Sequence, residues 1–509
     1  MKKVLKVINY LLLFLALVMF FSGIWATNTF AFTSFDEVLY TLTHTFHNAG
    51  QNLVSSYFIR NVGIPLLIIA ILITLTTIIN RWRKNAETIF IFKFRNKNIL
   101  SISLFHNKLL TLLKIIPILA FIFSFLFLGN KLYFFEYLKY QNTISDFIEA
   151  HYEDPLNVEI SFPTKKKNLI YIFMESMEST YSSQSNGGGY NTNYIPELTA
   201  IAKRYTNFSA NDKIGGAYDA SLTGFTMAGM LAQTSGIPLK TPFNGNFAYQ
   251  YYNTYFPGVY SLGDILQNQG YNQYLMVGSD AEFAGREKYF TDHGNYTIYD
   301  YNTAKQDGII PEDYFVFWGM EDEYLYQYAK QELSEISKQK EPFNFTMLTV
   351  DTHAPDGFLS EFCTIDEDDL YLSSVRCASK QLASFLEWIQ QQDFYKDTTI
   401  VIAGDHISMN TYSFDALEEN YTRSIYNVFI NSSATTKCNK NRIFNTMDLF
   451  PTTLAALGAK IEKEHLGLGT NLYSCVPTLF ETYGMSTVNE ELSKSSQFYN
   501  NCLLNGSCH

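Results

Sequence analysis

The sequence predicts an α/β domain with a mostly parallel central sheet flanked by helices, preceded by helices that cross a membrane. In the last two thirds of the chain, four apolar, strand-like runs each end on a polar group that can do chemistry, and helical segments separate them. This alternation is expected of a doubly wound sheet, whose sites lie along the carboxyl edge of its strands. Three further apolar runs in the first third each approach the ~20 residues that span a bilayer.

The overall composition excludes some classes of partner. The chain has 509 residues, 17% of them charged, and a net charge of -12 at pH 7. A chain of this length exceeds one hydrophobic core, so two or more structural units are expected. The negative balance argues against nucleic acid as a partner, because it leaves too little positive charge to neutralise phosphates along a groove.

The apolar runs of the first third cover about residues 8–26, 63–79 and 109–129. Lysine and arginine are frequent at the N-terminus and between the second and third runs, whereas residues 27–62 hold almost none. The positive-inside rule then places the N-terminus in the cytoplasm and everything after about Tyr133 outside the cytoplasmic (inner) membrane. A cleaved signal peptide is the alternative for the first run, but the run is long for one and no clear cleavage site follows.

These features divide the chain into three parts. Residues 1–140 are interpreted as a multi-pass membrane domain with about three transmembrane helices, 141–164 as a linker and 165–509 as an extracytoplasmic domain that carries the site. Within the first part, residues 35–57 have apolar side chains at mixed spacing. They form either an amphipathic helix on the outer surface of the membrane or a simple loop.

All six cysteines fall in the part predicted to lie outside the cytoplasm. An even number of cysteines in an oxidising compartment favours disulfides over metal ligation, and no C-x-x-C pair occurs. Proximity predicts two pairs and elimination the third: Cys363–Cys377, Cys502–Cys508 and Cys438–Cys475.

Each of the four strand-like runs ends at a candidate site residue. In chain order, the groups at the ends of these runs are Glu175, then Asp280 with Arg286, then His353, and last Asp405 with His406. Each has an ordinary explanation on its own, such as an acid at a helix start or a surface arginine. A site explains better why all of them fall at one edge of a sheet. Carboxylates and an imidazole around a threonine oxygen form a ligand set that suits Zn²⁺ or Mn²⁺.

A glycine-rich loop followed by a helix-compatible segment presents two threonine hydroxyls, those of Thr223 and Thr226. A hydroxyl at a helix N-terminus often only caps the helix. The same helix end also favours negative charge, so it stabilises an alkoxide or a phosphate. A threonine hydroxyl becomes a nucleophile only with a base or a metal beside it, and Asp405 with His406 can hold such a metal.

In content and order, these segments resemble those of the phosphoglycerol transferase/lipoteichoic acid synthase group of the alkaline phosphatase (sulfatase-like) superfamily. The resemblance is closest to the phosphoglycerol transferases that modify periplasmic glucans. It covers roughly residues 165–472. The motifs that carry it are Glu175 after Tyr171–Met174, Thr223–Gly229 with Ser235–Pro238, Gly278–Arg286, Asp351–Gly357 and Gly404–His406.

The resemblance implies a sulfatase-like catalytic domain with one bound Mn²⁺ or Zn²⁺ and a covalent phosphoglycerol–threonine intermediate. Glu175, Asp405 and His406 match the metal-ligand positions of the group, and the nucleophilic threonine completes the set. Thr226 is preferred as the nucleophile because its distance along the chain from the following Ser-Gly pair fits the wider superfamily. Thr223 is the alternative.

The resemblance also implies a binding site for the substrate. His353 and Arg286 match substrate-binding positions, and Asp280 precedes this arginine on the same segment. Lipoteichoic acid synthases carry a tryptophan near the matching arginine, and Ala284 stands in its place here. This departure argues against a polymer-making activity.

The expected function is a membrane-anchored, metal-dependent phosphotransferase. Phosphatidylglycerol is the expected donor, and a glycan or a glycerol-phosphate group is the expected acceptor. Thr226 attacks the donor phosphorus, and diacylglycerol leaves with a proton from His353. A phosphoethanolamine transferase and a non-catalytic membrane scaffold are the alternatives. A sulfatase is disfavoured because its formylglycine is made from cysteine or serine, which Thr226 cannot replace.

Overall fold

The structure is a computed structural model of the chain. The residues it describes are 2–29, 34–43, 55–83, 89–94, 97–103, 107–241, 254–361, 363–364, 369–410 and 412–507. They form two compact units, which we describe separately. The first comprises residues 1–29 and 49–135, and the second comprises 30–48 and 136–509.

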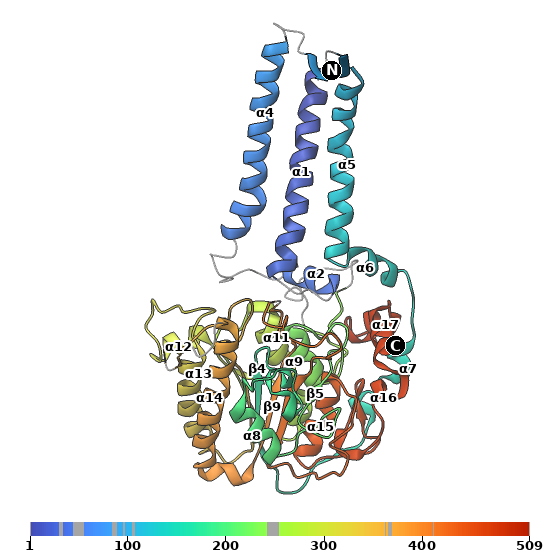
Figure 1. The fold of residues 1–509 in the computed structure, drawn as a ribbon. Coiled ribbons are helices and arrows are strands. Elements are labelled where there is room, and N and C mark those ends of the chain that lie inside the picture. Colours follow the sequence, from blue (N-terminus) through green and yellow to red (C-terminus); the bar gives the residue numbers. More distant parts are fainter. Residues whose placement is uncertain are drawn as a thin grey trace. The chain divides into compact units, whose positions relative to one another are not determined.

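The first unit is built from long apolar helices (Figure 1). Its elements are α1 (Lys2–Thr29), η1 (Phe58–Gly63), α4 (Ile64–Arg83), β1 (Ile89–Phe94), β2 (Lys97–Ser103) and α5 (Asn107–Lys131). Two helical segments, Val4–Thr29 and Ser55–Ile78, are long and apolar enough to cross a membrane. A third crossing is counted only if Ile115–Lys131 and Phe134–Gln141, which meet at 68°, form one span. The first two predicted spans therefore have matching helices, and the third corresponds to a bent helix pair that is either a broken span or a re-entrant loop.

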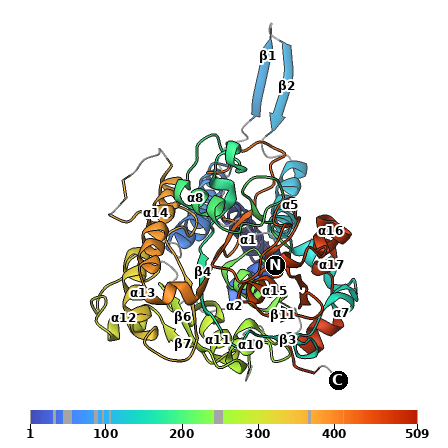
Figure 2. The same ribbon diagram turned by 90° about the horizontal axis from the view of Figure 1, so that it is seen from below.

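Within this unit, α1 lies between α4 and α5 (Figure 1). The rings of Phe20 on α1 and Phe127 on α5 lie 4.9 Å apart. Gly23 permits this close packing, because a Cβ at that position would come within 2.9 Å of the Phe127 ring. On the other side, the hydroxyls of Tyr10 and Thr76 form a 2.7 Å hydrogen bond that joins α1 to α4. The basic loop predicted between the second and third spans contains the antiparallel hairpin of β1 and β2, which Figure 2 shows along its length.

The second unit is organised around a seven-stranded sheet. In spatial order its strands are β5 (Gly216–Ala217), β10 (Ile425–Ile430), β9 (Thr398–Gly404), β4 (Asn168–Met174), β8 (Phe343–Leu348), β6 (Asn272–Val277) and β7 (Thr297–Tyr299). The five strands from β9 to β7 are mutually parallel, whereas β10 and β5 pair antiparallel at one side. The mostly parallel sheet predicted from the sequence is therefore confirmed.

Helices cover both faces of this sheet, which explains why its strands read as continuous apolar runs. Leu169, Tyr171 and Phe173 of β4 face one core, and Ile170 and Ile172 face the other. The helices that pack on the first face are α9 (Thr226–Ser235), α10 (Leu262–Asn268), α11 (Arg286–Asp292), α15 (Leu449–Ala456), α16 (Leu479–Tyr483) and α17 (Met485–Ser493). Those on the second face are α8 (Pro196–Arg204), α12 (Tyr301–Gln306), α13 (Asp322–Ile336) and α14 (Leu370–Gln390). Figures 1 and 2 show α13 and α14 on the side of the sheet opposite α15.

Two stretches that the sequence analysis assigned outside the catalytic domain are folded as parts of this unit. The stretch predicted as a linker, 141–164, includes α7 (Phe147–His151) and β3 (Ile160–Ser161), and β3 pairs with β11 (Lys460–Ile461). Burial of its apolar side chains, Ile148 among them, holds it against the domain. The short helix α2 (Phe35–Thr43) also belongs to this unit. The rest of the predicted 35–57 segment either lies in the first unit or falls outside the described residues.

Two of the predicted disulfides are confirmed. Cys363 is bonded to Cys377 and Cys438 to Cys475. Cys508, the predicted partner of Cys502, lies outside the described residues. Both disulfides lie in the second unit, and disulfides are typical of domains in an oxidising compartment.

Candidate active site and metal centre

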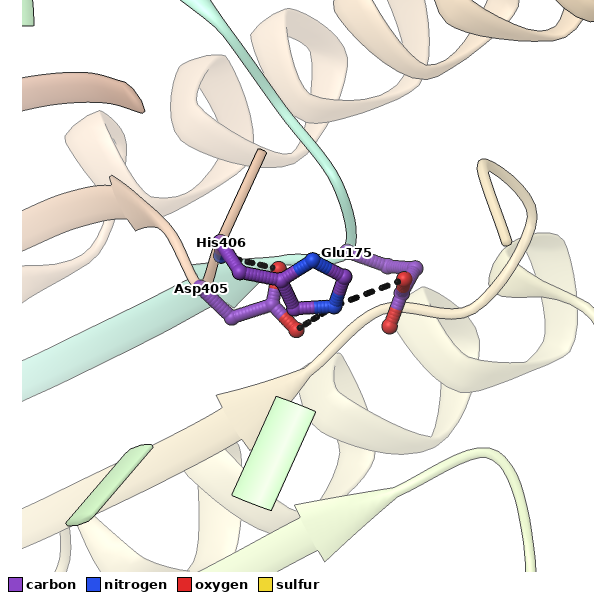
Figure 3. Close-up of side chains that lie close together, drawn as sticks. All are labelled: Glu175, Asp405 and His406. Carbon is purple, nitrogen blue, oxygen red and sulfur yellow. Dashed lines mark hydrogen bonds and ion pairs between the residues drawn. The ribbon is translucent and has the colours of Figure 1, made fainter. Parts of the chain in front are cut away.

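Two neighbouring parallel strands deliver three of the predicted residues to one point. β4 and β9 pair along their whole length, and Met174 lies opposite Gly404 at their carboxyl ends. The next residues in the chain are Glu175 on one strand and Asp405 with His406 on the other. Figure 3 shows their side chains converging beyond the strand ends. The register of the sheet therefore brings together residues about 230 positions apart in the chain, as expected for the carboxyl edge of a parallel sheet.

The three side chains are buried and in contact. His406 Nε2 lies 3.3 Å from Asp405 Oδ2 and 3.5 Å from Glu175 Oε1. The backbone N–H of Ser176 donates to Asp405 Oδ1 at 2.7 Å, which locks the two strand ends together. Ser176 adopts a left-handed conformation (φ 52°) to make this turn. A turn of this kind is costly for a non-glycine residue and is found where the surrounding structure enforces it.

Thr226 is the first residue of α9 and faces this cluster. Its hydroxyl donates to Glu175 Oε2 at 3.3 Å and lies 3.4 Å from His406 Nε2. The hydroxyl of Thr223 instead donates to the carbonyl of Ala220 at 2.9 Å. Of the two candidate nucleophiles, Thr226 is thus the one in contact with the acidic cluster.

A glycine lets α9 approach the end of β9 closely enough for that contact. A Cβ on Gly229 would come within 2.1 Å of the carbonyl oxygen of Asp405, so only glycine fits. One turn further along, Gln233 Nε2 donates to the carbonyls of Gly404 and Asp405 at 2.9 and 3.1 Å. The helix is therefore clamped to the strand end by a close backbone contact and by a side-chain amide.

The charges of the cluster are strongly coupled. Burial and the Glu175 carboxylate raise the pKa of Asp405 to about 7. Burial opposes ionisation of Glu175, but His353 and His406 outweigh it and lower the pKa of Glu175 to about 2. Burial also disfavours the imidazolium, yet the Asp405 and Glu175 carboxylates raise the pKa of His406 to about 10. The buried carboxylates thus favour a positive charge beside them.

The same residues fit a divalent cation. Glu175, Asp405 and His406 can each offer a ligand atom, and these atoms lie within 4.8 Å of one another. Among the described residues, Asp405 Oδ2 is buried without a hydrogen-bond partner. An unpaired buried carboxylate oxygen is costly unless a cation neutralises it. A mixed nitrogen and oxygen set of this kind is typical of Zn²⁺ and Mn²⁺ sites.

A pocket opens beside this cluster. Its lining includes Glu175, Thr226, Arg286, Trp318 and His353. We call this space the active-site pocket. It joins residues from the ends of β4, β6 and β8 with the starts of α9 and α11.

Arg286 is held by the turn that precedes α11. Its guanidinium donates to Ser279 Oγ at 2.9 Å, and to the carbonyls of Asp280 at 2.7 Å and Phe283 at 3.1 Å. The side chain is buried, and burial lowers the pKa of Arg286 to about 10, so it stays charged at neutral pH. The side chain of Asp280 accepts from the backbone N–H of Glu282 at 2.9 Å, and it is not among the groups that line the pocket.

His353 follows β8 and lies against an aromatic side chain that the sequence analysis missed. The rings of His353 and Trp318 lie 4.7 Å apart, and Trp318 also packs against Phe283 at 5.8 Å. The only signal in the sequence is the aromatic run 314–318, which has no strand or helix period. Ala284 lines the same pocket. Ala284 and Trp318 thus line the same pocket from two different segments.

Glu178, which also follows β4, has a structural role. Arg423 donates to both of its carboxylate oxygens, with Nε 3.0 Å from Oε2, and the N–H of Ser408 donates to Oε1 at 2.9 Å. This buried ion pair holds the segment after His406 in place. Glu178 is therefore committed to Arg423 and does not join the candidate ligand set.

Comparison with known proteins places the chain among relatives of this architecture. The sulfatase family model matches residues 167–459. Phosphoglycerol transferase I of Escherichia coli O127:H6 is 31% identical over 446 residues, which is 86% of this chain and 53% of that protein. The chain thus spans about half the length of the curated relatives it matches.

One solved structure shares this fold, and a second is reported beside it. Lipooligosaccharide phosphoethanolamine transferase A from Neisseria meningitidis, an integral membrane protein, has a TM-score of 0.50 and 14% identity, over 89% of this chain and 84% of that one. The lipoteichoic acid synthase LtaP from Listeria monocytogenes has a TM-score of 0.48 and 20% identity, over 64% and 80% of the two chains. At these identities the likeness concerns the fold alone. Because the family model covers more than half of its length, the chain belongs to the sulfatase family.

Proposed function

We propose that this chain is a membrane-anchored phosphotransferase that moves a phosphoglycerol group from phosphatidylglycerol to a glycan or glycerol-containing acceptor. The observation that carries the proposal is the position of Thr226. Its hydroxyl contacts Glu175 and His406 on one side and borders the pocket that holds Arg286 on the other. The 31% identity to a protein named phosphoglycerol transferase I supports the choice of transferred group.

The residues of the pocket divide the reaction between them. Arg286 binds the phosphate oxygens through its planar fork. The Thr226 oxygen releases its proton to solvent and forms a bond to phosphorus, while the bond from phosphorus to the diacylglycerol oxygen breaks. His353 gives the departing oxygen a proton. In the second step the acceptor hydroxyl returns a proton to His353 and its oxygen attacks phosphorus. The bond from phosphorus to the Thr226 oxygen then breaks, and this oxygen takes a proton back from solvent.

The proposal includes one divalent ion, Mn²⁺ or Zn²⁺, held by Glu175, Asp405, His406 and the Thr226 oxygen. When bound, such an ion lowers the pKa of a hydroxyl and neutralises charge on a phosphoryl group. The support for it is the buried Oδ2 of Asp405, which has no hydrogen-bond partner and lies 3.3 Å from His406 Nε2, together with the nitrogen and oxygen character of the set. The two metals differ little in what they ask of these ligands.

The membrane helices give the proposal its setting. A phospholipid donor is scarce in water, so a chain anchored by apolar helices is kept at the same surface as its substrate. The lysine and arginine pattern of the first third favours an extracytoplasmic catalytic unit. The disulfides Cys363–Cys377 and Cys438–Cys475 agree with that side of the membrane.

The test is to trap the covalent intermediate. Full-length protein in detergent is incubated with phosphatidylglycerol labelled in its head group, without acceptor, and digested for mass spectrometry. We expect a phosphoglycerol adduct on the peptide that contains Thr226. Thr226→Val keeps the size of the side chain and removes the nucleophile, so it should lose the adduct and turnover by a factor on the order of 10⁴ or more. Thr223→Val is the matched control and should keep both.

The same experiment separates the alternatives. Label that is transferred only from phosphatidylethanolamine would replace the proposed donor and leave the mechanism intact. Purified protein without a divalent ion, and with no adduct from either lipid, would favour a non-catalytic scaffold. An adduct on Thr223 would move the nucleophile and refute the geometry on which the proposal rests.

A further inference from the structure

The helix α2 lies in the segment between the first two apolar helices, yet it belongs to the same compact unit as the sheet. Four of its side chains, Asp36, Glu37, Val38 and Tyr40, are buried. Asp36 Oδ1 accepts the backbone N–H of Thr241 at 2.8 Å, which fixes one end of the helix to the domain. The sequence left open whether this segment lies on the membrane surface. In the structure, α2 presents its buried face to the unit that contains the sheet.

Tyr40 reaches the turn that carries Arg286. Its hydroxyl donates to the carbonyl of Ala284 and lies 3.1 Å from the hydroxyl of Tyr255. Tyr255 in turn packs on Gly285, where a Cβ would come within 3.0 Å of its ring. The two tyrosines thus enclose Ala284 and Gly285, the two residues before Arg286.

This turn needs support because its backbone is unusual. Ala284 and Gly285 both adopt left-handed conformations, with φ of 59° and 75°. Such a conformation is unfavourable for alanine unless contacts hold it. The Ala284 carbonyl accepts the tyrosine hydroxyl, and the next residue but one sends its guanidinium into the active-site pocket. The direction of Arg286 therefore depends on a contact from α2.

Tyr40 also touches the nucleophile side of the pocket. Its ring lies 5.0 Å from the ring of Phe225, the residue immediately before Thr226 at the start of α9. Tyr40 is 2% exposed, so both contacts are made in a desolvated place, where a lost hydrogen bond is felt most. One side chain from outside the sulfatase-like region thus contacts both the arginine turn and the residue that precedes the nucleophile.

We propose that Tyr40 is a positioning residue for donor binding: through the Ala284 carbonyl it fixes the turn that directs Arg286 toward the phosphate. The segment between the first two apolar helices is then a working part of the active site as well as a connection. This inference rests on the proposed function for its substrate, a phosphodiester bound by Arg286. It goes beyond that function by giving the α2 segment a role in binding.

The test compares Tyr40→Phe, Arg286→Ala and the double variant in the full-length protein. Tyr40→Phe keeps the ring on Phe225 and removes only the hydroxyl. We expect the KM for phosphatidylglycerol to rise about 3- to 10-fold, the range that one buried hydrogen bond contributes. The kcat should stay within about twofold, because the nucleophile is not moved. In the Arg286→Ala background the hydroxyl should have no further effect, since it acts through that arginine.

Tyr137→Phe is the matched control. Tyr137 is also buried, packs on α2 through Phe35 at 5.3 Å, and donates its hydroxyl to the carbonyl of Thr241 at 3.0 Å. Its removal costs the same kind of bond near the same helix without touching the arginine turn. We therefore expect a loss of thermal stability similar to that of Tyr40→Phe, but an unchanged KM.

A second readout keeps this inference separate from the donor assignment. The affinity for inorganic phosphate is measured by calorimetry on the wild type, Tyr40→Phe, Arg286→Ala and the double variant. It reports on phosphate binding by Arg286, whatever the head group of the donor. If phosphatidylglycerol is not turned over but Tyr40→Phe weakens phosphate binding only when Arg286 is present, the proposed donor fails and the positioning role stands. Additive effects of the two substitutions on both KM and phosphate affinity, or an equal KM change in Tyr137→Phe, would overturn the positioning role.

Discussion

The two walls of the active-site pocket are built in different ways. Glu175, Asp405 and His406 leave the ends of two adjacent parallel strands, where sheet register fixes their separation. Arg286, at the start of α11, and His353, in the loop after β8, line the pocket and are held by turns. We call the first group the strand wall and the second group the loop wall. The strand wall is held by the backbone of the sheet, whereas the loop wall depends on particular side chains that support each turn.

This difference indicates how the work is divided. Under the proposed function, the groups that would hold a cation and the nucleophile directly follow strands of the rigid sheet or begin the helix packed against it. The groups that would recognise the substrate are held by turns, which can vary without disturbing the core. Damage to the strand wall should therefore abolish chemistry, and damage to the loop wall should weaken binding. The following predictions test that division, beginning with the largest effect.

The largest effect is expected from Asp405→Ala. Substitution of a residue that hydrogen-bonds to a metal ligand lowers metal affinity or activity by about 10- to 100-fold. Loss of a ligand itself should therefore cost on the order of 1,000-fold in kcat/KM. The purified variant should also lose its divalent ion, measured by elemental analysis of the protein. Asp280→Asn is the control, because this acid also follows a strand but its side chain accepts from the N–H of Glu282. A variant that lost Asp405 and kept a full equivalent of metal would contradict the proposed ligand set.

The second prediction concerns the close contact between α9 and the end of β9. Gly229→Ala places a methyl group against the Asp405 carbonyl, at 2.1 Å in the present geometry. Such overpacking costs about 1–3 kcal/mol of stability. It must also push Thr226 away from the cluster, and a displacement of about 1 Å costs roughly 100-fold in rate. The measurement is kcat beside the thermal midpoint.

Met230→Leu, on the next residue of α9, is the control for this substitution. Met230 is fully buried, and a swap that conserves volume costs less than about 1.5 kcal/mol. It should leave kcat nearly unchanged. If Gly229→Ala lowered the thermal midpoint but not kcat, the close packing of α9 would serve stability alone.

The parts of the molecule that could be predicted from the sequence follow the same division. The runs before Glu175 and Asp405 are apolar, β-branched and short, so strands and their carboxyl ends were recognisable, and parallel pairing placed the two ends together. Trp318 escaped prediction because an aromatic run in a loop has no period that gives it a direction. Tyr40 escaped because its contact with Ala284 joins residues 244 positions apart through loop geometry alone.

The limits of the predicted domains have a physical cause too. Residues 141–164 carry no strong period and are rich in polar side chains, which reads as a linker. Their apolar minority, such as Phe147 and Val158, is nevertheless buried, and a two-residue strand pairs with β11. Pairings this short are decided by tertiary contacts rather than by local preference, so no sequence pattern announces them.

The third prediction concerns the loop wall. Trp318→Leu removes the ring that packs on His353 and Phe283 and should raise the KM for the donor about 3- to 10-fold, the range expected for lost aromatic contacts. The kcat should change less, because the strand wall is untouched. Trp388→Leu on α14 is the control, since Trp388 packs on Phe385 at a ring distance of 6.0 Å and does not line the pocket. An equal loss of kcat and no change in KM would place Trp318 with the chemistry instead.

The smallest effect is expected from the two buried acids, Asp322 and Asp351, that support the chain between β8 and His353. Asp322, the first residue of α13, accepts the N–H groups of Val350 and Asp351 at 2.7 and 3.3 Å, and Asp351 accepts the N–H of Asp322 at 3.0 Å. Burial raises the pKa of Asp322 to about 7. Burial and the Asp322 carboxyl raise the pKa of Asp351 well above its ordinary value. The end of β8 is thus supported by two buried carboxyls that favour the protonated form.

The sign of the pH dependence follows from these shifts. In the unfolded chain both acids release their protons near pH 4. In the folded chain they keep them to higher pH, so between about pH 4 and 7 the unfolded state binds fewer protons and stability falls as the pH rises. Asp351→Asn cannot ionise and retains an acceptor for the N–H of Asp322. Relative to the wild type, its thermal midpoint should therefore rise by about 2 °C or more between pH 5 and pH 8. Asp397→Asn is the control: a hydrogen bond from Lys165 lowers the pKa of Asp397, so this acid is ionised in both the folded and unfolded states from pH 5 to pH 8, and its difference from the wild type should not change over that range. A constant difference between Asp351→Asn and wild type at the two pH values would show that the loop wall is not held by a protonated carboxyl.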